Sequence, residues 1–238
     1  MKQIWILSKR ELASFFDSLV AYITLIAFLG FSGFFTWMYG ADIFIRKQAD
    51  LQVFFSVAKW TLFFFIPAIT MRSIAEERRS GTIELLLTKD LSGPQLVWGK
   101  YLGALIMVLI TLAFTLIYYL SVNTLGEMDH GATMCGYLGL ILMSSVYIAI
   151  GIFASSLTHN QIVSFLLSLF IAIFFQFIFD VLSSGGSGFV SEIASSLSMN
   201  ARFDSISRGV LDTKDLIYFI SLTALFVVLA QINIQKRK

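Results

Sequence analysis

Six stretches of the chain are apolar and long enough to cross a lipid bilayer. A transmembrane helix needs about 20 consecutive, mostly apolar residues. Runs of 24, 26 and 20 residues without Asp, Glu, Lys or Arg occur at 18–41, 101–126 and 216–235. A fourth run, at 130–179, has 50 residues. It is long enough for two spans joined by the polar turn at 155–161.

The remaining apolar stretch, at 51–71, contains one charged residue, Lys59. The 12 residues that follow Lys59 in this stretch are too few to cross, so Lys59 must lie within the span, near one end. From there its long side chain can reach the headgroups. We therefore predict an all-α polytopic membrane protein with six transmembrane helices, at 19–40, 52–72, 101–123, 134–155, 162–182 and 215–234.

The basic residues of the connecting segments predict the orientation. With the N-terminus inside, 11 Lys and Arg residues fall on the inner side and 5 on the outer side. Cytoplasmic connections are enriched in basic residues, so both termini are expected in the cytoplasm. The first apolar stretch is too long for a signal peptide and lacks a small-x-small cleavage site, so we expect it to be retained.

Composition excludes several classes of protein. Hydrophobic residues make up 57% of the chain and charged residues 13%, far below the roughly 25% charge of an average soluble domain. The net charge of +2 is too small for a nucleic-acid-binding surface. One cysteine, Cys135, and two histidines, His130 and His159, leave little material for a metal site. The spans contain no paired carboxylates and the chain no HExxH motif, so we do not expect an enzyme.

Residues 2–18 are the first of three segments that are not plain spans. Four apolar side chains share one stripe of the predicted helix: Trp5, Leu12, Phe16 and Leu19. Phe15 lies beside this stripe, and most of the charged side chains lie on other faces. The pattern predicts an amphipathic helix in the cytoplasmic headgroup plane, anchored by Trp5. The alternative is that this segment is only the solvated end of span one.

The second segment, residues 73–100, connects spans two and three. Glu76 lies four residues after Arg72 and three before Arg79, spacings at which opposite charges pair on a helix. We predict that the helix of span two continues beyond the membrane, with these charges matched to one another.

Gly81 is expected to end that helix, and Thr82 to cap a new short helix at 83–88. The leucine-rich surface of the short helix would need a protein partner in the cytosol. The alternative is that these leucines enter the lipid interface.

Residues 92–95, Ser-Gly-Pro-Gln, have the form of a capping box and predict the start of the third long helix.

The third segment, residues 183–214, separates spans five and six. Its first part, 183–188, is rich in Ser and Gly and predicts a flexible connector. Apolar residues at helical spacing follow: Phe189, Ile193, Leu197, Ala201, Ile206, Val210 and Leu211. Two structures fit this pattern, helices that re-enter the membrane from outside and an ordinary loop on the outer surface.

Two ionisable residues in the spans are candidates for function, because charges within a membrane are costly. Lys59 and Asp180 are both expected near the outer ends of their spans. They would either form an ion pair or reach water and headgroups separately. Gln176 in span five is expected to hydrogen-bond between helices.

Five segments of the chain share a pattern with one known family: Lys9–Leu12, Phe15–Tyr22, Pro67–Arg72, Glu76–Thr88 and Gly99–Lys100. They resemble the permease subunits of ABC-2 type transporters. Within that family the resemblance is closest to the gliding-motility-associated permease and the permease of nitrous-oxide-reductase maturation. The six-span layout extends the likeness over a single transmembrane domain at 1–238. One departure is Asp90-Leu91, where such permeases usually have Pro-Val.

The resemblance implies an ATP-driven exporter of the bacterial inner membrane. ATP and magnesium would bind separate ABC ATPase subunits, because this chain has no GxxxxGK[ST] motif and is expected to bind no cofactor. The implied partners are these ATPases, a second permease copy or paralogue, an outer-side accessory protein and membrane lipid. Residues 183–214 would form outer re-entrant helices.

The resemblance also implies that the loop at 73–100 holds a coupling helix that docks on the ATPase, with the N-terminal helix as a second contact. The implied ATPase-coupling residues are Arg10, Phe15, Glu76, Glu77, Gly81, Thr82, Glu84, Leu85 and Leu86. Lys59 and Asp180 are the candidate pathway residues. Two alternatives are a stand-alone secondary carrier, which the scarcity of buried charge disfavours, and a membrane scaffold without transport.

Overall fold

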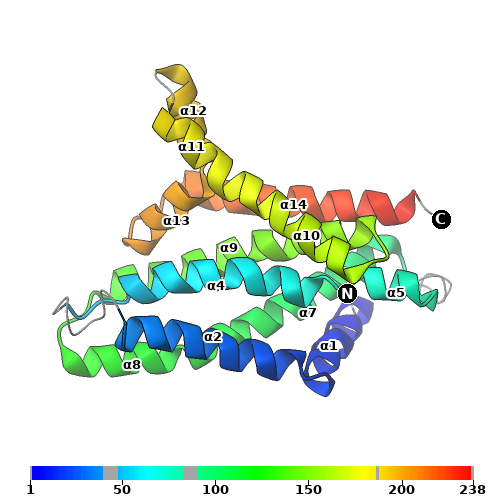
Figure 1. The fold of residues 1–238 in the computed structure, drawn as a ribbon, viewed down its shortest axis with the longest axis horizontal. Helices are drawn as coiled ribbons and strands as arrows, with labels where there is room; N and C mark the ends of the chain where they lie inside the picture. Colours follow the sequence, from blue (N-terminus) through cyan, green and yellow to red (C-terminus); the bar gives the residue numbers. More distant parts are fainter. Residues whose placement is uncertain (1, 40–47, 83–90, 186–187, 237–238) are drawn as a thin grey trace.

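The computed structural model describes residues 2–39, 48–82, 91–185 and 188–236, and every regular element in them is a helix (Figure 1). Six helical stretches are long and apolar enough to cross a membrane. The predicted all-α architecture with six spans is confirmed. The six stretches are Val20–Trp37, Gln52–Arg79, Gly93–Leu125, His130–Leu157, Gln161–Gly185 and Thr213–Gln235.

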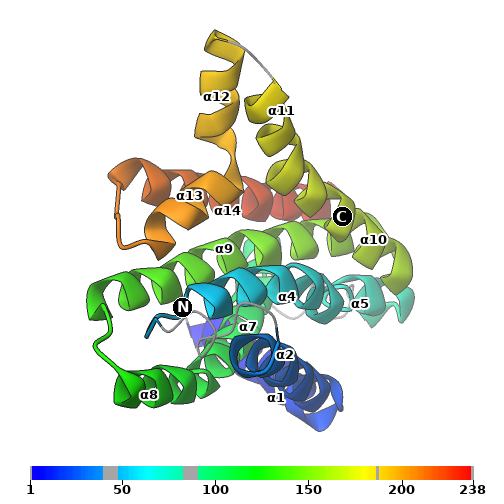
Figure 2. The same cartoon turned by 60° about the vertical axis from the view of Figure 1, so that its left-hand side comes forward.

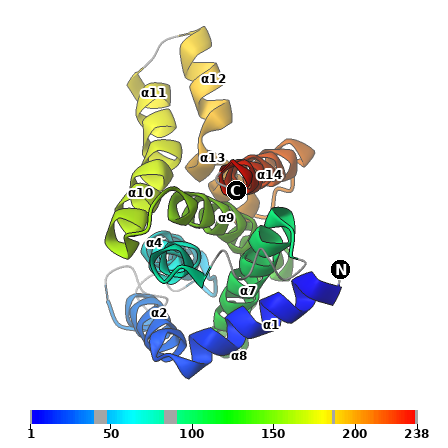
Figure 3. The same cartoon turned by 90° about the vertical axis from the view of Figure 1, so that its right-hand side faces the viewer.

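Helix α9 (His130–Leu157) forms the centre of the bundle. Five consecutive residues of α9, 146–150, are buried, so the helix is covered on all its sides, as expected for a helix that is apolar all round. Among the described elements, several helices pack around it, as Figure 3 shows in the view along the bundle. The main ones are α4 (Gln52–Thr70), α7 (Gly93–Phe114), α10 (Gln161–Ile173), α13 (Met199–Ser207) and α14 (Thr213–Gln235).

Two glycines of α9 let α4 approach it closely. A Cβ atom on Gly151 would lie 1.9 Å from Thr70 Oγ1, and one on Gly136 would lie 2.3 Å from the ring of Phe55. Helices in a bilayer gain little from hydrophobic burial against each other, so their association depends on such close packing at small residues. The position of α4 against α9 is therefore set by the absence of two side chains.

Two more glycines hold α1 (Lys2–Asp17) across α7. A Cβ atom on Gly99 would lie 2.5 Å from Leu7 Cδ2, and Ser8 Oγ donates a hydrogen bond of 3.0 Å to the Gly99 carbonyl. A Cβ atom on Gly103 would lie 2.8 Å from Glu11 Cβ. The stripe that includes Trp5 is not the face packed on α7, since Trp5 is exposed. Its placement in the headgroup plane stays a prediction.

The predicted capping box at the start of the third long helix is confirmed. The Ser92 side chain accepts a hydrogen bond from the Gln95 amide, and the Gln95 side chain accepts one from the Ser92 amide. Helix α7 therefore begins at Gly93, before the predicted start of the span at residue 101. A short helix, α8 (Leu116–Leu125), continues this span.

Three helices follow the fifth span. α11 (Phe179–Gly185) and α12 (Phe189–Leu197) form a hairpin that projects from the bundle, and α13 (Met199–Ser207) returns to pack on α9 (Figures 1 and 2). The predicted connector at 183–188 is wrong for its first three residues, which are helical because α11 continues the fifth span. The predicted helical pattern beyond it is confirmed for α12 and α13, but Val210 and Leu211 follow α13 outside a helix. Entry of these helices into the bilayer stays a prediction.

Candidate functional site

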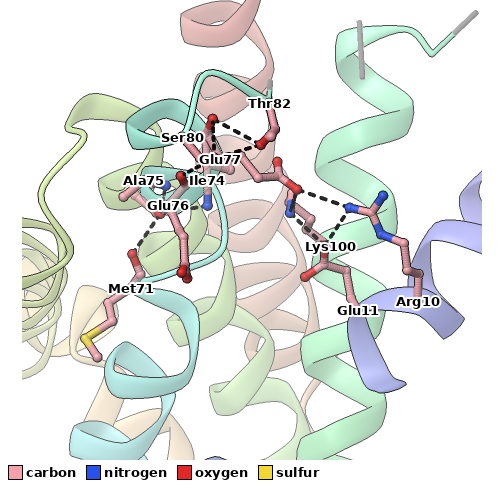
Figure 4. Close-up of polar contacts among 11 residues, drawn as sticks. Arg10, Glu11, Met71, Ile74, Ala75, Glu76, Glu77, Ser80, Thr82 and Lys100 are labelled. Atoms are coloured by element: carbon pink, nitrogen blue, oxygen red, sulfur yellow. Dashed lines mark hydrogen bonds and ion pairs between the residues drawn. The ribbon is translucent and has the colours of Figure 1, made fainter. Parts of the chain in front are cut away.

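Helices α1, α7 and α5 (Ala75–Arg79) meet at an ion cluster around the buried Lys100 (Figure 4). Lys100 Nζ lies 2.7 Å from Glu11 Oε1 and 2.8 Å from Glu77 Oε1, and the Lys100 side chain is 1% exposed. Arg10 Nη2 lies 3.3 Å from Glu77 Oε1 at the exposed edge. We call these four residues the Lys100 cluster. It ties three helices together through one ammonium group.

The charges of the Lys100 cluster cancel, which makes its burial tolerable, because a buried charge needs a partner. Burial raises the pKa of the Glu77 carboxyl, while the Lys100 ammonium acts in the opposite direction. The second oxygen of Glu77, Oε2, is buried without a hydrogen-bond partner. The cluster is therefore neutral but leaves one acceptor atom unsatisfied.

The Lys100 cluster lies near the end of the second span. The second span and its continuation, Gln52–Arg79, have 28 residues, more than the roughly 20 that a bilayer requires. The charged residues of this stretch, apart from Lys59, all follow Thr70. Helix α5 therefore extends beyond the membrane and leads into the predicted coupling helix.

A second set of bonds fixes α5 to the bundle core. Ser155 Oγ in α9 accepts hydrogen bonds from the amides of Ile74 and Ala75, at 3.0 and 2.9 Å, and donates one to the Met71 carbonyl at 3.1 Å (Figure 4). The first amides of a helix have no partner within the helix, so Ser155 satisfies two groups that burial would otherwise leave unpaired. Displacing α5 means moving α9 or breaking these bonds.

The predicted pairing of Glu76 with Arg72 and Arg79 is wrong. Residues 71–74 form turns between α4 and α5, and none of these three side chains forms an ion pair within the described part of the chain. Exposed pairs of long side chains gain little free energy, so nothing holds them together. The neighbouring carboxylate, Glu77, makes the ion contacts instead.

Gly81 ends α5 as predicted, with a φ of 70°, a value that glycine adopts without strain. Thr82 Oγ1 donates a hydrogen bond of 3.3 Å to the Glu77 carbonyl and so closes α5. Three of the coupling residues implied by the resemblance, Glu84, Leu85 and Leu86, lie outside the described residues. The short helix at 83–88 stays a prediction.

At the opposite end of the bundle, Lys59 and Asp180 do not pair with each other. Lys59 Nζ lies 3.3 Å from Asp204 Oδ1 of α13, and Lys59 is only 8% exposed. That the Lys59 side chain reaches toward the headgroups stays a prediction. Asp180 instead accepts hydrogen bonds from Ser198 Oγ and, at 2.6 Å, from Asn200 Nδ2. The sequence offered no signal for Asp204, because it lies 145 residues from Lys59.

A π-helical turn, η1 (Phe174–Ile178), interrupts the fifth span beside these groups. Tyr147 of α9 donates a hydrogen bond of 2.6 Å to Gln176 Oε1, and the Gln176 carbonyl accepts one of 3.1 Å from Asn200 Nδ2. A π turn disturbs the regular pairing of backbone groups and often marks functional positions. The expected interhelical role of Gln176 is confirmed: it links α9 to the fifth span and α13.

Replacing Lys59 with methionine separates a structural role from a functional one. We expect a loss of stability of at most about 1 kcal/mol, because Asp204 is half exposed and can be hydrated. Fluorescence-detected size exclusion of the expressed protein measures abundance and midpoint temperature. A normal abundance with abolished transport would assign Lys59 to the pathway. A loss of both would make the Lys59–Asp204 pair a structural element only.

Comparison with known proteins supports a transporter. No curated protein matches the chain. A family model described as ABC-2 family transporter protein matches residues 48–232, which are 185 of the 238 residues. The match begins just before α4, contains α5 and Lys100, and ends within α14. The chain therefore belongs to the ABC-2 family of transporter proteins.

Proposed function

We propose that this permease moves its cargo outward by using ATP hydrolysis on a separate ABC ATPase subunit. The observation that carries the proposal is the Lys100 cluster. It joins α5, which leads into the predicted coupling helix, to α1 and α7 through contacts of 2.7 and 2.8 Å. An element that receives force from a partner must be connected stiffly to the spans that it moves.

The contacts of α5 support transmission to the spans. A push on residues 83–88 would reach α5 directly. From α5 it would pass to α9 through Ser155 and to α1 and α7 through Lys100. A loose loop would absorb the same displacement. Packed helices shift as units between discrete arrangements, so we infer that α5 acts as a lever on the bundle.

The division of roles among the coupling residues follows from their contacts. Glu77 faces Lys100 and is therefore proposed to position α5 rather than to touch the ATPase. Arg10 is exposed at the edge of the cluster and Glu76 on α5, which leaves both accessible to a partner. Phe15 is only half-buried, and we propose that it supports α1 as the second contact.

The wider assembly is also proposed. Two permeases, identical or paralogous, would pair with two ATPases in the bacterial inner membrane, with the termini of this chain in the cytoplasm. The resemblance of Glu76–Thr88 to gliding-motility permeases supports a cargo linked to that process. The scaffold alternative predicts an ATPase that turns over while no cargo moves.

Replacing Leu85 with aspartate tests the proposed docking. We expect co-purification of the ATPase from native membranes to fall at least about tenfold, because a central apolar contact contributes more than 1 kcal/mol to binding. Val210→Asp is the matched control, an exposed apolar residue beyond the outer end of α13, and should not change co-purification. Full association and transport by the Leu85 variant would refute docking through 83–88.

A further inference from the structure

A cavity of about 310 Å³ lies between α1 and the turn that joins α4 to α5, beside the Lys100 cluster. Part of its lining is apolar: Phe15, Val20 and Ile69. Val20 is the first residue of α2 and Ile69 lies in the last turn of α4. The cavity is therefore level with the ends of two spans, where the headgroups of the inner leaflet lie.

The charged residues of the lining form two sets. The four members of the Lys100 cluster neutralise one another. The other two, Arg72 and Glu76, are exposed, and neither has an ion pair or a side-chain hydrogen bond among the residues that the structure describes. Glu77 Oε2 is a further acceptor without a partner, but the atom is buried and cannot be reached from the cavity. Among the described residues, the cavity thus offers one free cation and one free carboxylate.

We propose that this cavity binds the headgroup of a phosphatidylethanolamine-type lipid from the inner leaflet. The phosphate would lie at Arg72, with Arg10 beside it, and the primary ammonium would donate to Glu76. Charge-assisted hydrogen bonds of this kind are among the strongest available to a polar ligand. The acyl chains would leave along Phe15 and Ile69.

The chemistry of the lining selects among headgroups. The charges of the lining sum to zero, and an anionic phosphatidylglycerol has no ammonium group to place at the Glu76 carboxylate. Phosphatidylcholine carries the same charges as phosphatidylethanolamine, but its quaternary ammonium has no N–H to donate. An ATPase side chain is the other conceivable occupant. The apolar part of the lining and its level at the span ends favour the lipid.

The proposal is tested by lipid binding to the purified full-length permease, without the ATPase. Native mass spectrometry after exchange into detergent with equal amounts of phosphatidylethanolamine, phosphatidylcholine and phosphatidylglycerol reports which lipid is retained. We expect one bound phosphatidylethanolamine, preferred at least about tenfold over the other two. Arg72→Gln and Glu76→Gln should each lower its retention about tenfold, the change that corresponds to one charge-assisted hydrogen bond.

Two matched variants control for charge alone. Arg79 lies on α5 outside this cavity, and Glu127 lies in the connection between α8 and α9. Arg79→Gln and Glu127→Gln should retain phosphatidylethanolamine like the wild type. Equal retention of all three lipids, or undiminished retention by both cavity variants, would overturn the proposal. Loss of ATPase association in the cavity variants without any lipid preference would assign the cavity to the ATPase instead.

Discussion

Replacement of Lys100 by methionine is expected to destabilise the protein by about 3–5 kcal/mol, the usual cost of removing one partner from a buried ion pair. Methionine fills a similar volume, but Glu11 and Glu77, whose side chains are 13% and 14% exposed, would then face each other with only the exposed Arg10 as a cation. The midpoint of thermal unfolding of the purified permease in detergent measures the loss. ATPase activation should fall in parallel, because α5 loses its connection to α1 and α7.

The control for this prediction is Lys214→Met, which removes an exposed charge and should change stability by less than about 0.5 kcal/mol. Adding Glu11→Gln and Glu77→Gln to the Lys100 variant should recover most of the stability, because the uncompensated carboxylates are then gone. This triple variant should remain uncoupled from the ATPase. An unchanged midpoint for Lys100→Met alone would show that the cluster does not join the three helices.

The second large effect is expected for Gly151→Ala in the contact between α4 and α9. The added Cβ would lie 1.9 Å from Thr70 Oγ1 and 2.8 Å from Thr70 Cβ, so the two helices must separate. Overpacking of this kind costs about 1–3 kcal/mol, and we expect the upper end because the atoms met lie close to the backbone. Thermal unfolding and expression level in the membrane measure the effect.

Gly30→Ala provides the matched control, since a Cβ there meets no atom within 4 Å. Alanine also suits a helix interior better than glycine does, by roughly 0.5–1 kcal/mol. The control should therefore be neutral or slightly stabilising. Thr70→Ala should relieve only part of the Gly151→Ala defect, because the Cβ contact remains. If Gly151→Ala and Gly30→Ala were equally stable, α4 and α9 would be less closely packed than described.

These contacts differ between the two ends of the bundle. At one end, Ser155 and Lys100 bind α5 to α9, α7 and α1. At the other end, Gly136 and the Lys59–Asp204 pair also join helices, but the α11–α12 hairpin projects away and a π turn interrupts the fifth span. We expect a displacement that enters at α5 to be expressed mainly at the fifth span and its hairpin.

Predictions from local physics agree with the structure. Apolar length predicted six spans, and the Ser92–Gln95 spacing predicted the start of α7. Gly81 was expected to end a helix and adopts the backbone conformation that favours glycine. Each of these features depends on residues within a few positions of one another, so the chain reveals them without knowledge of its neighbours.

Predictions of which charged side chains pair with each other were less accurate. Glu76 was expected to pair along its own helix, yet Glu77 pairs with Lys100, 23 residues away. Lys59 was considered as a partner of Asp180, yet it meets Asp204 on α13. The sequence did not predict the close helix contacts that Gly99, Gly103 and Gly151 permit.

The sequence by itself therefore determined the membrane class, the number of spans, the helix ends at Gly81 and Ser92 and the family, because apolar length, capping and motif spacing are local properties. Only the tertiary structure decided which charges meet, which glycines admit a neighbouring helix and where a polar cavity opens at the membrane edge. Those features depend on residues far apart in the chain, and their energies come from burial and close contact, which a linear pattern does not contain.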